Sequence, residues 1–363
     1  MKIVIKIGSS TLTGKAGSAL NVDAVNKLVE VVARLKSHGD EVVIVSSGAI
    51  AAGLAPIGLS SRPKDLASQQ AAASVGQGLL IAKYNEALSK HKLVAAQVLL
   101  TIEDVVRRSH YQSAQRTLTK LLSLGAVPII NENDSVGTQE IKFGDNDRLS
   151  ALVSHLIGAD KLVLVTDIDA LYDAPPSNAG AKRIAVVKNL NELESADIGG
   201  VGSSGVGSGG MITKVEAARI VTSAGIEMLL TNLDNLEDAI SGKDVGTRFT
   251  VVDDRKPSRA LWLEYASETR GKLFLDAGAV TAILERGVSL LPAGVTKVEG
   301  NFSAGDTVEL ISTYGKAIAK GLVSFDSDEI PQLLGKSTKD LAAELGAEYE
   351  RELVHRDDLV LLV

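Results

Sequence analysis

Short apolar, β-branched runs alternate with longer segments of helical periodicity from the N-terminus to about residue 250. Most of these runs are apolar at every position, as in strands that are covered on both faces. The expected strands are Val4–Ile7, Glu41–Val45, Val94–Leu99, Val127–Ile130, Leu162–Val165 and Met228–Leu230. Helical patterns lie at Val25–Leu35 (after a cap at Asn21 or Asp23), Ala67–Leu88, Asp104–Leu124, Asp147–Leu156 and Val215–Ala224. This alternation predicts an α/β fold with an open, largely parallel sheet and helices on both faces.

The pattern changes after Gly246. We expect a polar linker over 253–270, leading into a strand at Leu261–Leu263, between a first domain at 1–252 and a small, mostly β domain at 271–363. Its expected strands are Lys272–Leu275, Val288–Leu290, Val295–Glu299, Thr307–Ile311 and Ala317–Val323, with helices at Thr281–Glu285 and Lys339–Leu345.

Composition excludes several classes of protein. The formal net charge of -7 makes the whole chain a poor electrostatic match for nucleic acid. The absence of cysteine removes disulfides and thiolate metal sites. The N-terminal apolar run is too short for a signal peptide and no stretch is long and apolar enough to span a membrane, so a cytoplasmic protein is expected.

A glycine and serine tract at 199–210 leads into Met211-Ile212-Thr213-Lys214 and an amphipathic helix. On composition alone it fits a flexible surface loop. However, glycine N–H groups and a helix N-terminus form a favourable phosphate site. A lysine in the first turn opposes the helix dipole, and an anion that it must meet explains its position.

Lys6 interrupts an otherwise apolar strand that ends in Gly8-Ser9-Ser10. A buried lysine needs a partner, so Lys6 either lies on an edge strand with its ammonium group in water or binds phosphate. Ser46-Ser47-Gly48 ends a second strand, where small residues leave room for a ligand at the carboxyl edge of the sheet.

Two turns are rich in acids and amides, Asn131-Glu132-Asn133-Asp134 and Gly144-Asp145-Asn146-Asp147. Either one alone is ordinary turn chemistry. Directly after a buried strand, such groups can recognise an α-ammonium group. Their spacing fits no metal motif, so no protein-bound metal site is expected, and the five histidines are scattered.

Taken together, these motifs resemble the amino acid kinase family, in the branch that phosphorylates glutamate. The matching segments are 6–10, 46–53, 130–134, 142–147, 164–167 and 207–214. Segments 279–287, 289–292, 300–302 and 355–358 resemble the PUA domain that follows the kinase domain in bacterial members.

The resemblance implies transfer of phosphate from ATP to the γ-carboxylate of L-glutamate, the first step of proline synthesis. Catalytic roles would fall on Lys6, Lys214 and Asp147, the last holding both lysines. The nucleotide would be bound by Lys6, Thr166, Asp167, Ser208, Gly209, Gly210, Met211, Ile212, Thr213 and Lys214, and Mg²⁺ would arrive with ATP. Glutamate would be bound by Ser47, Asp134 and Asn146, with Asp145 nearby. The family also suggests a homo-oligomer, a dimer or tetramer, and proline as a feedback inhibitor.

One departure is visible, because Ala170 stands where the family commonly has glycine before Leu171-Tyr172. This departure affects the expected contacts with the nucleoside part of ATP.

Two alternative functions stay open at this point. One is another amino acid kinase, acting on N-acetylglutamate or carbamate, and the other is an RNA-binding protein acting through the PUA-like domain. Residues 270–363 contain ten Lys or Arg and fifteen Asp or Glu, a balance of -5 that disfavours RNA.

Overall fold

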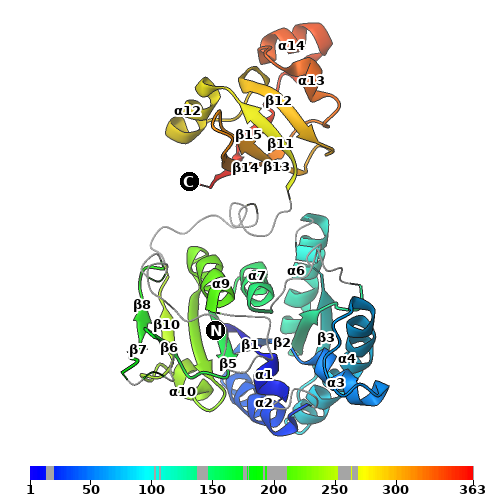
Figure 1. Cartoon of the computed structure of the whole chain (residues 1–363), viewed down its shortest axis with the longest axis vertical. Coiled ribbons are helices and arrows are strands. Elements are labelled where there is room, and N and C mark those ends of the chain that lie inside the picture. The colour runs from blue at the N-terminus through cyan, green and yellow to red at the C-terminus, as the bar shows by residue number, and fades with distance from the viewer. Residues whose placement is uncertain are drawn as a thin grey trace. The chain divides into compact units, whose positions relative to one another are not determined.

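The computed structural model describes residues 1–13, 20–101, 104–105, 108–136, 146–174, 178, 180–190, 193, 211–251, 263 and 269–362. The chain divides into two compact units, Met1–Arg255 and Lys256–Val363 (Figure 1). Each unit has its own sheet and its own hydrophobic core.

The first unit is built on a sheet whose described strands run in the order β3-β4-β2-β1-β5-β9-β10-β8. The pairs from β3 to β9 are all parallel, while β10 runs antiparallel to β9. The predicted open, largely parallel sheet is confirmed. The strands are β1 (Lys2–Ile7), β2 (Glu41–Ser46), β3 (Ala95–Leu100), β4 (Val127–Glu132), β5 (Lys161–Thr166), β8 (Val186–Val187), β9 (Glu227–Asn232) and β10 (Thr247–Phe249), with a separate pair β6 (Leu171–Tyr172) and β7 (Arg183–Ile184).

Helices cover both faces of this sheet. Residues of α2, α4 and α10 share one core cluster with the strands, whereas α6, α7 and α9 contact the strands from outside that cluster (Figure 1). The predicted helices are confirmed, and the Asn21 side chain accepts the N–H of Ala24 as the cap of α2. The bounds are α1 (Ser9–Thr13), α2 (Val22–Ser37), α3 (Ala49–Leu54), η1 (Ala55–Ile57), α4 (Leu66–Ser89), α6 (Arg108–Ser123), α7 (Asn146–Ile157), α9 (Met211–Ser223) and α10 (Leu236–Ile240).

The central strand β1 decides where Lys6 points. Ile3, Ile5 and Ile7 belong to the core cluster with α2 and α4, so alternation places Lys6 on the opposite face, toward α7. Because β1 pairs with β2 on one side and β5 on the other, the edge-strand interpretation of Lys6 is wrong. Its side chain is only 5% exposed.

The second unit is a five-stranded mixed sheet in the order β12-β11-β13-β14-β15, with short helices packed on it. Here β11 is parallel to β13 and the other pairs are antiparallel. The bounds are β11 (Thr269–Leu275), α12 (Ala277–Arg286), η3 (Pro292–Gly294), β12 (Val295–Gly300), β13 (Thr307–Ile311), β14 (Ala317–Val323), α13 (Ile330–Leu333), α14 (Thr338–Leu345), η4 (Ala347–Tyr349) and β15 (Val354–Leu361).

One predicted strand of this unit is wrong. Val288–Leu290 is not a strand, and only Leu290 forms an isolated bridge, to Val354. Pro292 lies two residues after Leu290 and starts a 3-10 turn, which leaves no room for a ladder. Leu261, Trp262 and most of the expected linker lie outside the described residues. Leu263 is described and buried, but it is not in a strand. The boundaries at 252 and 270 stay predictions.

Two glycines let helices α3 and α4 cross with their backbones in contact. A Cβ on Gly53 would lie 1.9 Å from the carbonyl oxygen of Ala72, and one on Gly76 would lie 1.7 Å from that of Ala49. Any side chain at either position must push the helices apart. Since α3 directly follows the Ser47-Gly48 turn, this crossing also holds the start of α3 next to the carboxyl end of β2.

We predict that Gly76→Ala or Gly53→Ala lowers the free energy of unfolding by about 2–3 kcal/mol, because overpacked cores lose roughly that much. Gly78→Ala in the same helix is the matched control. A Cβ there meets nothing within 4 Å, so alanine should raise stability by about 0.5–1 kcal/mol through helix propensity. Urea unfolding of the three variants measures both effects. A Gly76→Ala variant as stable as the Gly78→Ala variant would contradict the close crossing.

Candidate active site

The carboxylate of Asp147 holds two lysine ammonium groups. Lys6 Nζ lies 2.6 Å from Oδ1, and Lys214 Nζ lies 3.2 Å from Oδ2. All three side chains are buried, with 5% of Lys6, 8% of Lys214 and none of Asp147 exposed. The contact that the resemblance implies for Asp147 is therefore present in the structure.

Each member of this cluster comes from a different element. Lys6 is on β1, Asp147 is in the first turn of α7, and Lys214 is in the first turn of α9. Thr213 Oγ1 also donates to Asp147 Oδ2, at 3.1 Å. Taken by themselves, two ammonium groups and one carboxylate sum to a positive charge, which suits an anionic ligand at two helix N-termini.

Gly8 keeps the space next to Lys6 open. Its N–H donates to the carbonyl oxygen of Val165 at 3.1 Å, which fixes the chain as it leaves β1. A Cβ on Gly8 would come within 3.7 Å of Lys6 Nζ. A larger residue here would occupy the surroundings of the ammonium group.

A second cluster centres on the side chain of Asn146, which is 8% exposed. The two N–H groups of its Nδ2 lie within hydrogen-bond distance of three acceptors, so one of them is shared: the carbonyl oxygen of Ser46 at 3.1 Å, Ser47 Oγ at 2.9 Å and Asn131 Oδ1 at 2.9 Å. Asn131 Oδ1 also accepts the backbone N–H of Glu132, at 2.9 Å. A carbonyl can only accept and a backbone N–H can only donate, so these two groups fix the orientation of both amides.

The consequence concerns the other end of the Asn146 amide. Its nitrogen is surrounded by protein acceptors, which leaves Oδ1 as the atom that can meet a ligand. A carbonyl oxygen accepts hydrogen bonds, so it recognises a donor such as an ammonium group. Asp134 lies in the turn that follows β4 at the same edge of the sheet.

The remaining predicted residues lie on the other side of β1. Thr166 ends β5 and donates to Asp167 Oδ1 at 2.9 Å. The strand order β4-β2-β1-β5 therefore separates Asn131 and Ser47 from Thr166 and Asp167, with Lys6 between them. Met211 and Ile212 begin α9, and Ile212 is 83% exposed.

Ser208, Gly209 and Gly210 lie outside the described residues, as do Gly144 and Asp145. The structure thus brings Lys6, Asp147, Thr213 and Lys214 into one cluster and Ser47 and Asn146 into a second. These clusters meet at adjacent residues, because Asn146 and Asp147 are consecutive at the start of α7.

Comparison with known proteins decides the family. The family model described as "Amino acid kinase family" matches residues 1–232, and the PUA domain model matches residues 271–345. The chain belongs to the amino acid kinase family.

Two curated relatives cover almost all of this amino acid kinase. The glutamate 5-kinase of Streptomyces avermitilis is 58% identical over 99% of this chain and 96% of its own length. The glutamate 5-kinase of Thermobifida fusca is 56% identical over 99% of this chain and 93% of its own length. Among solved structures, carbamate kinase from Giardia lamblia bound to AMP-PNP matches with a TM-score of 0.51 and 19% identity, over 69% of this chain and 98% of that one. At this identity the likeness shows the shared fold alone.

Ala170, where the resemblance suggested glycine, is fully buried before β6. The next residue, Leu171, donates its N–H to Thr247 Oγ1 at 2.8 Å, and Thr247 Oγ1 donates to the carbonyl oxygen of Ile184. The buried methyl group of Ala170 is thus accommodated in a segment that is hydrogen-bonded to its neighbours.

Sequence reasoning assigned no role to three residues that support the site. Asn131 orients Asn146, while Ser46 and Tyr84 share a buried hydrogen bond of 2.9 Å. Asn131 stands in a motif that indicates the site, whereas Tyr84 lies inside a helical pattern and belongs to none of the motifs. No local signal marks its hydroxyl as the partner of a strand end far away in the sequence.

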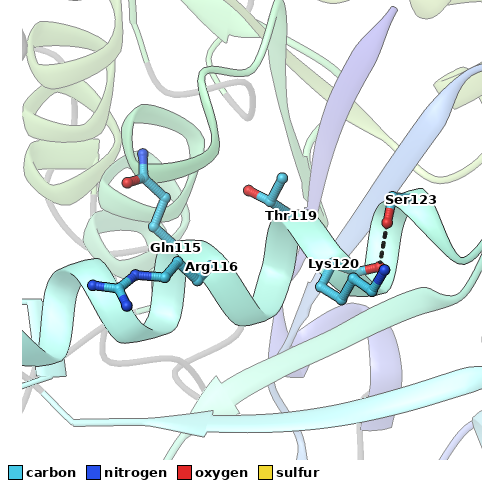
Figure 2. Close-up of a pocket in the computed structure, with 5 residues that line it drawn as sticks. All are labelled: Gln115, Arg116, Thr119, Lys120 and Ser123. Atoms are coloured by element: carbon cyan, nitrogen blue, oxygen red, sulfur yellow. Dashed lines mark hydrogen bonds between the residues drawn. The ribbon is translucent and has the colours of Figure 1, made fainter.

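A concave surface of about 340 Å³ lies elsewhere, along one side of α6 (Figure 2). Its lining residues are Gln115, Arg116, Thr119, Lys120 and Ser123. All five are exposed, and none is a predicted site residue. It is separate from the two polar clusters.

Two kinds of feature are absent from the part of the chain that the structure describes. There, no group of three or more histidine or acidic residues has the arrangement of a metal site. Within the same residues, no helix is both long enough and apolar enough to cross a membrane.

We predict that Asp147→Asn lowers the free energy of unfolding by about 3 kcal/mol, since removing one partner of a buried ion pair strands the other charges. Kinase turnover should fall on the order of 10²-fold or more, because both lysines lose their common anchor. Urea unfolding and steady-state kinetics measure the two effects.

Asp234→Asn is the control for this variant, because Asp234 pairs with Lys27 at the surface. It should change stability by less than about 1 kcal/mol and leave turnover unaltered. Equal effects of the two substitutions would contradict the anchoring role of Asp147.

Proposed function

We propose that this chain transfers the γ-phosphoryl group of MgATP to the γ-carboxylate of L-glutamate, giving ADP and L-glutamyl 5-phosphate, the first step of proline biosynthesis. The observation that carries the proposal is the buried Lys6–Asp147–Lys214 cluster at the carboxyl edge of the sheet. The relatives that match the whole length of the chain are named for this activity.

The chemistry needs no general base. A carboxylate is ionised at neutral pH, so one of its oxygens attacks the γ-phosphorus while the bond from that phosphorus to the bridging oxygen breaks and ADP leaves. The barrier comes from bringing two anions together and from charge on the equatorial oxygens of the transferring group. Two preorganised ammonium groups, Lys6 and Lys214, would stabilise that charge.

The strand order supports a division of the site into two halves. We assign the nucleotide to the β5 side, with Thr166, Asp167 and the segment from Ser208 to Lys214, and glutamate to the β2 and β4 side, with Ser47, Asp134 and Asn146. Lys6 on β1 lies between the two halves, where the phosphoryl group must pass. Mg²⁺ would arrive with ATP, its charge offsetting that of the phosphates.

The orientation of Asn146 favours glutamate over N-acetylglutamate. With its nitrogen held by protein acceptors, Oδ1 of Asn146 can accept a hydrogen bond from a ligand, and the carboxylate of Asp134 adds negative charge at the same edge. Both suit a free α-ammonium group, which carries three donors and a positive charge. An acetylated nitrogen keeps one donor, loses the charge and needs space for the acetyl group.

A panel of acceptors tests the reaction. Purified protein is incubated with MgATP and glutamate, N-acetylglutamate or carbamate, and acyl phosphates are trapped with hydroxylamine. We expect hydroxamate from glutamate alone, whereas turnover on N-acetylglutamate without turnover on glutamate would refute the substrate assignment.

We predict that Lys214→Ala lowers kcat by about 10²–10³-fold while glutamate affinity changes little, because a transition-state charge is lost and the acceptor contacts are kept. Lys243→Ala, at an exposed ion pair with Asp238, is the control and should leave kcat unchanged. Equilibrium dialysis with labelled glutamate measures binding. Wild-type kcat in Lys214→Ala would remove this lysine from the mechanism.

We also propose that the chain forms a homo-oligomer, a dimer or tetramer. Val75 and Leu79 lie one turn apart on α4 and are 39% and 42% exposed, an apolar surface that a second copy would cover. Sedimentation velocity tests this, with Leu79→Lys expected to shift the chain toward a monomer. A monomeric wild-type chain would refute the proposal.

Feedback inhibition by proline and a cytoplasmic location follow from the family alone. Adding proline to the glutamate assay tests the first, and cell fractionation tests the second.

The net charge of -5 over residues 270–363, which contain the PUA-like domain, disfavours RNA binding. A salt-sensitive, tight gel shift of structured RNA by the full chain would revive that alternative.

A further inference from the structure

Tyr84 carries a buried hydroxyl group that phosphoryl transfer itself does not use. The residue lies in the second half of α4, is fully buried, and belongs to the core cluster between α4 and the sheet. Its hydroxyl oxygen lies 2.9 Å from Ser46 Oγ, where β2 ends. The hydrogen bond therefore joins the core of the domain to the start of the proposed acceptor half of the site.

The direction of this hydrogen bond can be assigned. Ser46 Oγ also lies 3.0 Å from the carbonyl oxygen of Ser47, and a carbonyl can only accept. The single hydroxyl proton of Ser46 is thus used on Ser47, so Tyr84 must donate to Ser46 Oγ. Burial raises the pKa of the Tyr84 phenol well above its ordinary value, which keeps this proton in place.

The two serines at the end of this chain of hydrogen bonds hold Asn146. Ser46 offers its carbonyl oxygen and Ser47 its hydroxyl oxygen to Asn146 Nδ2, at 3.1 and 2.9 Å. Directly afterwards Gly48 has a φ of 98°, a left-handed turn that starts α3. The Ser47 peptide thus lies between the end of β2 and this turn, where the hydrogen bonds of Ser46 and Asn146 hold it.

We propose that Tyr84 is a positioning residue for the acceptor amino acid, which it never touches. Its hydroxyl, acting through Ser46, holds the Ser47 peptide and the Asn146 amide in the orientation that binds the acceptor. This inference rests on the proposed assignment of Ser47 and Asn146 to the acceptor half of the site. It concerns acceptor binding, so the nucleotide half, on the far side of β1, is unaffected.

The test removes only the hydroxyl. Tyr84→Phe keeps the ring in the core, and we expect the KM for the acceptor to rise about five-fold, the effect of losing one ordinary hydrogen bond. The KM for ATP should stay within a factor of about two. Ser46→Ala breaks the same link from its other end and should raise the acceptor KM similarly, which keeps the test valid if Tyr84→Phe folds poorly.

A double-variant cycle separates this role from general destabilisation. In the Ser46→Ala background, Tyr84→Phe should have no further effect on the acceptor KM, because the link is already broken. Tyr111→Phe is the matched control, since Tyr111 also makes a part-buried hydrogen bond, of 3.1 Å to His155 Nδ1, but lies on α6. It should leave both KM values unchanged.

Three results would overturn the proposal. These are an unchanged acceptor KM in both Tyr84→Phe and Ser46→Ala, an equal rise in both KM values, or a full effect of Tyr84→Phe in the Ser46→Ala background. Failure of the proposed function is a separate result, seen when the wild-type chain makes no hydroxamate from glutamate. The same variants are then compared with whichever acceptor the panel identifies.

Discussion

Asp147 is a fully buried carboxylate, and the arrangement of the site depends on it. Moving an ion into a protein interior costs several kcal/mol, which is offset only when the partner geometry is good. Asp147 has an ammonium group on each oxygen, at 2.6 and 3.2 Å, and thereby allows two lysines to be buried as well. An apolar trio of similar volume would often be at least as stable. The presence of three charged groups at this position is therefore better explained by chemistry than by stability.

The sheet explains why this carboxylate can reach both lysines. Lys6 points to the face that α7 covers, and α7 and α9 pack side by side (Figure 1). Asp147 and Lys214 place the first turns of both helices close to Lys6, near the carboxyl end of β1. Asn146, the neighbour of Asp147, contacts β2 and β4 instead. One helix start thus connects the Lys6–Asp147–Lys214 cluster to the Asn146 cluster, and the order of the strands places the proposed nucleotide and acceptor halves on opposite sides of β1.

Much of this fold can be predicted from the sequence, because buried parallel strands are apolar at every position and the apolar residues of helices recur about every 3.6 residues. The positions of the site residues are harder to predict from the sequence. Lys6 could be on an edge strand or in the centre, since pairing with β2 and β5 is set by distant segments. In the second unit, β15 was missed because His355, Arg356, Asp357 and Asp358 interrupt its apolar pattern. Val288–Leu290 has the composition of a strand, but only Leu290 pairs with another segment, in a single bridge to Val354.

The central claim is that one carboxylate makes Lys6 and Lys214 act as a unit. Comparing kcat for Lys6→Met, Lys214→Met and the double variant with MgATP and glutamate tests it most directly. We predict that each single substitution lowers kcat by about 10²–10³-fold, and that the double variant is within about ten-fold of the worse single one. If the loss in the double variant instead equals the product of the two single losses, the lysines act independently and the claim is wrong.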